Sequence, residues 1–116
     1  MTIEECYAHL GSNYDEVLRR FGTADLVAKF LLLLPKDESY AKLCAALREK
    51  NGEEAFRSAH SLKGICMNLG LESLYHPTYA LTEELRGRKV TEKAELLFCD
   101  LKKEYGRTLE YIKELA

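Results

Sequence analysis

Apolar residues recur once per helical turn in the middle of this 116-residue chain, and this periodicity constrains the fold more than any other feature. The side chains that share one helix face are Ala55, Ala59, Leu62, Cys66 and Leu69. Such a stripe is typical of an amphipathic helix that buries one side. Asn51 can cap the beginning of this helix through Asn51-x-x-Glu54, and Gly70 can end it. The sequence therefore predicts a central helix with one face in a core.

Capping signals predict two short helices before this central helix. The signals are Thr2-x-x-Glu5 and Asn13-x-x-Glu16, with stops at Gly11 and Gly22. Helices this short are marginal alone, so they are expected to dock over one end of a larger bundle.

Residues 24–50 are predicted to form one long helix, capped by Thr23 and kinked near Pro35. The reason is that six side chains keep one helical phase past the proline. They are Leu26, Phe30, Leu33, Tyr40, Cys44 and Leu47. The alternative is a break at Lys36, with Asp37 capping a new helix.

Two further helices are predicted after Gly70. The stripe of residues 71–86 consists of Leu71, Leu74, Thr78, Leu81 and Leu85. Pro77 should kink or restart this helix, and Gly87 should stop it. The inward positions of the last helix, at about 91–115, are Ala94, Leu97, Leu101, Tyr105, Leu109 and Ile112.

Four long amphipathic segments joined by short turns predict an all-α fold. The expected architecture is an antiparallel four-helix bundle with the short N-terminal helices capping one end. Residues 1–116 would form a single domain whose bundle core covers about 24–115, because the length suffices for one hydrophobic core.

Composition excludes several classes of function. The net charge of −2 argues against a non-specific nucleic-acid binder. No apolar run approaches the roughly 20 residues that span a bilayer, and the first residues do not resemble a signal peptide. The four cysteines show no Cys-x-x-Cys spacing, so no metal site is predicted from them, and reduced thiols favour the cytoplasm.

His60 lies about 120° from the centre of the central stripe on a helical wheel, at the boundary between core and water. Phe56, Lys63 and Met67 share its flank, one or two turns away, and Gly64 lies directly above it. Gly64 costs about 1 kcal/mol of helix propensity relative to Ala, which indicates that the missing side chain is useful.

The segment Ala59-His60-Ser61-Leu62-Lys63-Gly64, followed by Asn68-Leu69-Gly70, resembles the signature of histidine phosphotransfer (HPt) domains. The resemblance extends from about Tyr14 to Arg86. It implies a phosphoryl carrier in a two-component multistep phosphorelay, in which His60 accepts a phosphoryl group from an aspartate.

The resemblance also implies roles for residues around His60. Lys63 would contact phosphoryl oxygens, and Gly64 would leave space for the phosphoryl group and a partner's loop. Thr82 aligns with a family position that often carries an amide, so a hydroxyl would replace that contact weakly. Arg86 resembles a basic family position that approaches the phosphoryl group. The residues expected to share the partner-docking surface are Phe56, Arg57 and Met67.

The expected partners are receiver domains of response regulators or hybrid histidine kinases. The chain has no nucleotide motif and is not expected to be an enzyme or to hold a cofactor, so the receiver would supply Mg²⁺. We expect a cytoplasmic, monomeric, free-standing protein, although an excised domain is an alternative. Two other functions remain open: a helical adaptor that docks receivers or other signalling proteins without phosphorylation, and a metal site combining His60 and His76 with a carboxylate.

Overall fold

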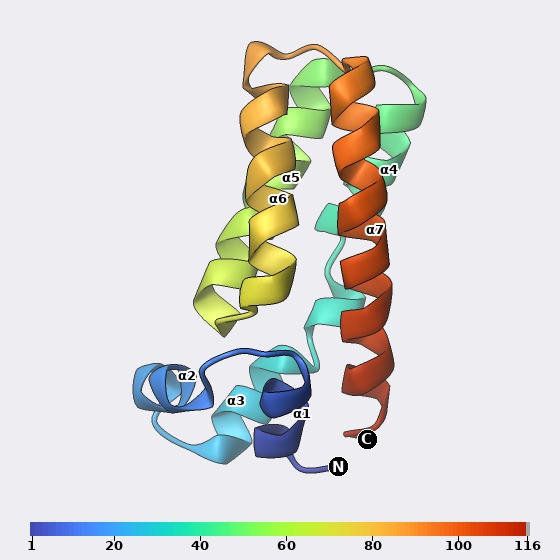
Figure 1. The fold of residues 1–116 in the computed structure, drawn as a ribbon. Helices are drawn as coiled ribbons and strands as arrows, with labels where there is room; N and C mark the ends of the chain where they lie inside the picture. Colours follow the sequence, from blue (N-terminus) through green and yellow to red (C-terminus); the bar gives the residue numbers. More distant parts are fainter. Residues whose placement is uncertain (116) are drawn as a thin grey trace.

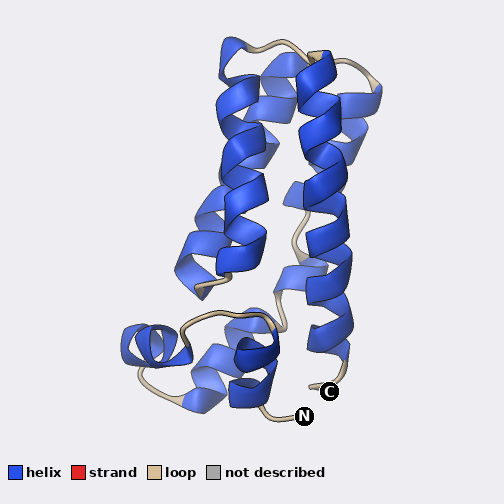
Figure 2. Cartoon of the chain, viewed as in Figure 1, coloured by secondary structure: helices blue, strands red, loops and turns tan. Residues whose placement is uncertain are grey.

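The structure is a computed structural model that describes residues 1–115. Within this range it contains helices and no strand (Figure 2), so the all-α prediction is confirmed. The elements are α1 (Ile3–His9), α2 (Tyr14–Phe21), α3 (Ala24–Leu31), the 3₁₀ turn η1 (Leu34–Lys36), α4 (Ser39–Arg48), α5 (Gly52–Leu69), α6 (Glu72–Glu84), the 3₁₀ turn η2 (Leu85–Gly87) and α7 (Glu92–Lys113).

The helices α4, α5, α6 and α7 run side by side, whereas α1, α2 and α3 gather at one end of them (Figure 1). Helix α5 packs against α4 and α6, and α6 packs against α7. The ring of Tyr40 on α4 stacks on Tyr105 of α7, with centroids 3.8 Å apart. The body is elongated and measures 40 × 23 × 21 Å. Helix α5 contacts both α4 and α6.

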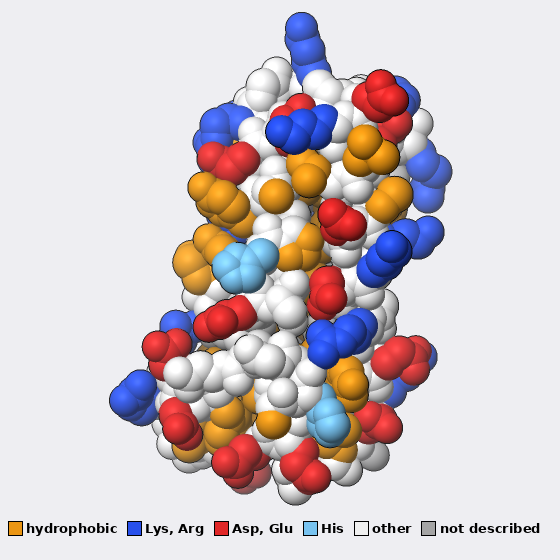
Figure 3. All heavy atoms as spheres, viewed as in Figure 1, with side chains coloured by type: hydrophobic (Ala, Val, Ile, Leu, Met, Phe, Trp, Pro, Cys, Tyr) orange, Lys and Arg blue, Asp and Glu red, His pale blue; other side chains and the backbone are white. Residues whose placement is uncertain are grey.

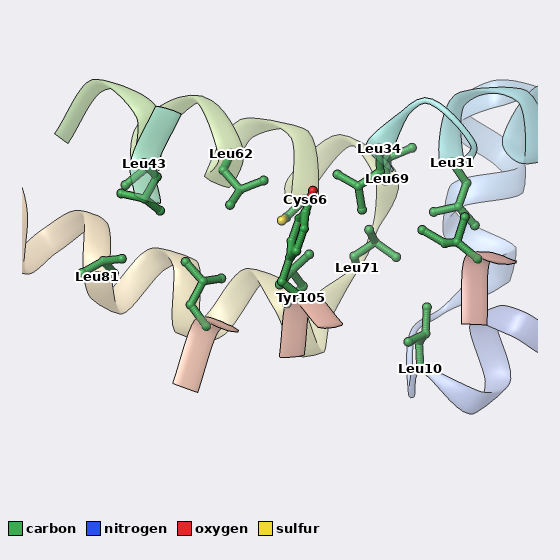
Figure 4. Packing of buried hydrophobic residues seen from close by; sticks show 14 of the residues in the cluster. Leu10, Leu31, Leu34, Leu43, Leu62, Cys66, Leu69, Leu71, Leu81 and Tyr105 are labelled. Carbon is green, nitrogen blue, oxygen red and sulfur yellow. The ribbon is translucent and has the colours of Figure 1, made fainter. Parts of the chain in front are cut away.

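The core lies between these four helices and continues into the N-terminal helices. Cys66 of α5 and Tyr105 of α7 lie next to each other, and Leu62 of α5 lies one turn along (Figure 4). These three residues and Leu81 of α6 are buried. Burial of a leucine side chain contributes roughly 1.5–3 kcal/mol. This packing fixes which side of α5 faces solvent.

The predicted helix caps are present. Asn13, Thr23 and Asn51 each accept a hydrogen bond from the backbone three residues later, and Thr2 forms a capping box. Thr91, which was not predicted as a cap, does the same for α7. Gly70 ends α5 in the left-handed conformation, with φ of 63°.

The N-terminal helices hold the end of α5. The Tyr7 hydroxyl donates to the carbonyl of Leu69 at 2.6 Å. The Arg20 guanidinium donates to the carbonyls of Met67 and Asn68 at 2.8 and 2.5 Å. The last carbonyls of a helix have no partner within the helix, so these bonds stabilise the end of α5.

The predicted single helix over 24–50 is wrong. Helix α3 ends at Leu31, a 3₁₀ turn follows, and α4 begins at Ser39. Pro35 has no N–H to donate to the carbonyl of Leu31, so a continuous helix would lose that bond. The Asp37 carboxylate accepts from the Ser39 N–H at 2.8 Å, which agrees with the alternative of a break near Lys36.

The predicted phase of α3 is wrong as well. The buried residues of this segment are Val27, Leu31 and Leu34. In contrast, Leu26, Phe30 and Leu33 are 39%, 40% and 48% exposed. Because the chain breaks at Pro35, α3 and α4 are separate helices and need not bury side chains in the same helical phase.

The later helices follow their predicted stripes. All five stripe residues predicted on the 71–86 segment are buried, and Pro77 lies inside α6 without restarting it. On α7, Ala94, Leu101, Tyr105 and Ile112 are buried, whereas Leu97 and Leu109 are half-buried. None of the helices in residues 1–115 combines the length and apolarity required to cross a bilayer.

Candidate functional site

His60 lies near the middle of the 18-residue helix α5 and is exposed. Its neighbours Ala59 and Leu62 are fully buried, as are Ala55 and Cys66, and Leu69 is almost so. The predicted apolar stripe of α5 is therefore confirmed. The His60 imidazole lies outside this buried face, on the side of the helix that meets solvent.

Two contacts define how α5 and α6 face each other. The Arg86 guanidinium lies 5.3 Å from the ring centroid of Phe56, and the Lys63 ammonium lies 5.7 Å from that of Tyr79. Lys63 follows Phe56 by seven residues on α5, whereas its partner Tyr79 precedes Arg86 by seven residues. The two segments are therefore antiparallel here. His60 consequently lies opposite positions 82 and 83 of α6.

Of these two positions, only Glu83 is available to the site. The side chain of Glu83 is 39% exposed. Thr82 is fully buried, and its hydroxyl donates to the Thr78 carbonyl at 2.7 Å. This bond to the preceding turn is common for threonine in helices. The expected contact of Thr82 with a phosphoryl group is therefore contradicted, because a buried hydroxyl with a partner cannot reach solvent.

Phe56 connects His60 to two arginines. The Phe56 and His60 ring centroids lie 5.8 Å apart, and the Arg88 guanidinium lies 3.9 Å from the Phe56 ring centroid, closer than Arg86. A guanidinium over an aromatic ring contributes about 0.5–1 kcal/mol at an exposed site. Phe56 is only 9% exposed, so it positions cations and offers little docking surface of its own, contrary to expectation.

Arg88 was missed by the sequence analysis. It adopts a left-handed conformation with φ of 62°, and its guanidinium donates to the Arg86 carbonyl at 2.6 Å. Its Nε also lies 3.3 Å from a carboxylate oxygen of Glu53. The sequence carried no signal for this placement, since left-handed residues are usually glycine.

The arginines around His60 are paired with carboxylates. Arg86 lies 2.6 Å from Glu83, and Arg57 lies 3.5 Å from Glu53. The hydrogen bond from Arg86 lowers the pKa of the Glu83 carboxyl, and positive charge on Lys63 and His60 lowers it further. The same bond raises the pKa of Arg86. His60, Lys63, Glu83 and Arg86 thus form one electrostatic cluster.

Gly64 leaves open space beside His60. A Cβ at this position would meet no heavy atom within 4 Å outside its own helix backbone. Met67, two turns from His60, is 54% exposed, and Arg57 is also exposed. The structure therefore brings the open space at Gly64 and exposed apolar and cationic groups to the same side of α5 as His60.

The other histidines have different surroundings. The His9 ring stacks on Tyr111, with centroids 5.1 Å apart. His76 is exposed and lies edge-on to Tyr75. Among residues 1–115, the structure contains no group of three or more His, Cys, Asp or Glu side chains that could hold a metal ion.

An exposed histidine therefore lies on the side of packed helices, beside cations and a gap. The Hpt domain family matches residues 25–114, which is most of the chain and includes His60. The chain therefore belongs to the Hpt domain family, whose members are phosphocarrier modules that interact with receiver domains in two-component phosphorelays. No individual curated protein and no solved structure shows significant similarity to the chain.

Proposed function

We propose that this protein carries a phosphoryl group on His60 between the aspartates of receiver domains in a multistep phosphorelay. One observation carries the proposal: the exposed His60 ring has Lys63 on its own flank and open space at Gly64. The match to the Hpt family supports the general reaction, and the geometry supports His60 as the acceptor.

Phosphoryl transfer requires little covalent chemistry from the carrier. A ring nitrogen of His60 would attack phosphorus in line, and the P–O bond to the receiver's aspartate would break as the N–P bond forms. The aspartate would leave as a carboxylate, and the ring N–H proton would pass to solvent. The partner receiver would supply the acidic residues and Mg²⁺, so the transfer site is complete only in the complex.

The side chains near His60 have distinct proposed roles. Lys63 and Arg86 would contact phosphoryl oxygens, because charge-assisted hydrogen bonds to phosphate are among the stronger ones. Gly64 would admit the receiver's loop. Arg57 and Met67 would lie in the docking surface, since exposed apolar residues near charges suit transient recognition.

The helices α4 to α7 would serve as a rigid support for this site. We take them to form an antiparallel four-helix bundle, capped at one end by α1 to α3, within a single domain of residues 1–116. A monomeric cytoplasmic carrier would be consistent with cysteines that remain free thiols over the described chain.

The direct test is phosphotransfer from a phosphorylated receiver. The expected product is acid-labile, base-stable phosphate on the wild-type protein, which is lost in His60→Gln and retained in the control His76→Gln. Labelling that survives His60→Gln would refute the assignment of the site. Binding of receivers with no labelling from any of them would favour the alternative of a non-phosphorylated adaptor.

A further inference from the structure

We infer that Glu83 sets the lifetime of a phosphoryl group on His60, acting as an acidic residue that makes the phosphorylated state easier to discharge. This inference rests on the proposed function of His60. It concerns a residue of α6 outside the segment that resembles the family signature.

Glu83 is placed beside His60 by the register of the two helices. Phe56 faces Arg86, and Lys63 faces Tyr79, so the α6 positions opposite His60 are 82 and 83. Thr82 faces the core, which leaves Glu83 as the exposed one of these two positions, close enough to His60 for their charges to interact.

Glu83 also forms an ion pair with Arg86 of η2. The Arg86 Nη2 and Nε atoms donate to one oxygen of Glu83 at 2.6 and 3.2 Å. A phosphoryl group on His60 would compete with Glu83 for this guanidinium. As long as the carboxylate holds Arg86, less of its positive charge is available to the phosphoryl oxygens.

The carboxylate acts on the leaving group as well. Hydrolysis of a phosphohistidine breaks the N–P bond, and water forms the new P–O bond. The ring leaves with the electron pair of the broken bond and takes a proton from solvent. A negative charge next to the ring favours the protonated ring, which leaves more readily, and repels the dianionic phosphoryl group.

Other charges around the ring oppose this effect. Lys63 lies on the same helix as His60, while Arg86 lies in η2 and Arg88 directly follows it. Arg88 is itself paired with the Glu53 carboxylate. Glu83 is therefore the carboxylate of this cluster, and Glu53 lies at its edge, paired with Arg88 and Arg57. Glu53 is the more distant, because it meets the cluster through Arg88.

The size of the effect follows from the exposure of the groups. Exposed ion pairs are weak, whereas a phosphoryl group carries nearly two charges. Glu83→Gln removes the carboxylate and also releases Arg86 from its ion pair, and both changes should lengthen the phosphohistidine lifetime. We therefore expect Glu83→Gln to lengthen the phosphohistidine lifetime roughly three- to tenfold.

The experiment needs no partner protein. The protein is phosphorylated with phosphoramidate, a small donor of phosphoryl groups to imidazole, and the loss of phosphate at pH 7 is followed by intact mass. Glu83→Gln should be longer-lived, whereas Glu83→Asp should stay within about twofold of wild type because it keeps the charge.

Glu104→Gln is the matched control. Glu104 forms the same kind of pair with Arg107, three residues later, at 3.3 Å on α7. Its substitution removes one negative charge and one surface pair without touching the cluster around His60. Its phosphohistidine lifetime should equal that of wild type.

The outcomes separate the inference from the proposed function. Wild-type protein that acquires no phosphate on His60 refutes both. Phosphorylation of His60 with equal lifetimes for Glu83→Gln and wild type refutes the inference alone. Equal lengthening by Glu104→Gln also refutes it, because the effect would then be one of net charge. A short-lived Glu83→Asp beside a long-lived Glu83→Gln supports it.

Discussion

Two glycines of α5 are expected to respond to alanine in opposite directions. Gly52 is buried at the beginning of the helix, and a Cβ there would overlap the backbone carbonyl group of Arg88 and lie 2.7 Å from the Lys89 nitrogen. Backbone atoms of a turn cannot rotate away as a flexible side chain can. Gly64 has no heavy atom within 4 Å of such a Cβ.

The magnitudes follow from these surroundings. Overpacking in a well-packed region costs about 1–3 kcal/mol, so Gly52→Ala should lower the free energy of unfolding by that amount. Replacing a helical glycine by alanine in open space gains about 0.5–1 kcal/mol, so Gly64→Ala should raise it. Each kcal/mol corresponds to roughly 4 °C in Tm for a chain of this size.

Urea unfolding followed by circular dichroism at 222 nm measures both changes. Wild type, Gly52→Ala and Gly64→Ala are compared at one pH, and their m-values show whether the extent of unfolding is the same. A Gly52→Ala protein as stable as wild type would refute the close approach between α5 and the turn at Arg88. A destabilised Gly64→Ala protein would refute the open space beside His60.

Three further predictions concern stability. Leu62→Ala should cost about 2–5 kcal/mol in urea unfolding because it leaves a core cavity, whereas His60→Ala should cost less than about 1 kcal/mol because the ring is exposed. Arg20→Ala should cost about 1–2 kcal/mol and speed hydrogen exchange at the end of α5, since the carbonyls of Met67 and Asn68 lose the guanidinium and Met67 keeps only the Gly70 N–H. The pKa of Glu83 is lowered in the folded state. Its ion pair therefore contributes its full stability at pH values above the pKa of the unfolded state, and this contribution is lost as the pH falls through the pKa of the folded state. The stability difference between wild type and Glu83→Gln should therefore narrow from pH 6 to pH 3, and a constant difference would contradict the ion pair.

The central helix was predictable because several signals agree along it. A cap at Asn51, a stop at Gly70 and an uninterrupted apolar stripe all indicate the same boundaries. The stripe also placed His60 at the edge of the core, and this exposure is what the structure shows. One helix face was enough to predict which side of α5 meets solvent.

The segment before it was not predictable in the same way. Nearly every position from Leu26 to Leu34 is apolar, so more than one helical phase fits the pattern. The choice depends on where the chain breaks, and Pro35 breaks it with a 3₁₀ turn. Tertiary packing of Val27 and Leu31 then decides which residues are buried.

The electrostatics of the site depend on a turn that is distant in sequence from His60. Arg88 reaches Phe56 because its backbone is left-handed and because Gly52 lets the turn approach the beginning of α5. Neither condition can be read from the residues around the histidine. A periodic pattern predicts the face that His60 occupies, but not the charges that α6 and its turn place next to it.

The helix register is therefore the property on which the chemistry of this site depends. A shift of α6 by one turn would move Glu83 and Arg86 away from the ring without changing any residue of the segment around His60. The buried Leu81 and Leu85 prevent this shift, since a turn's displacement would leave both without their present packing. Core leucines of α6 and η2 thus determine which charges His60 meets.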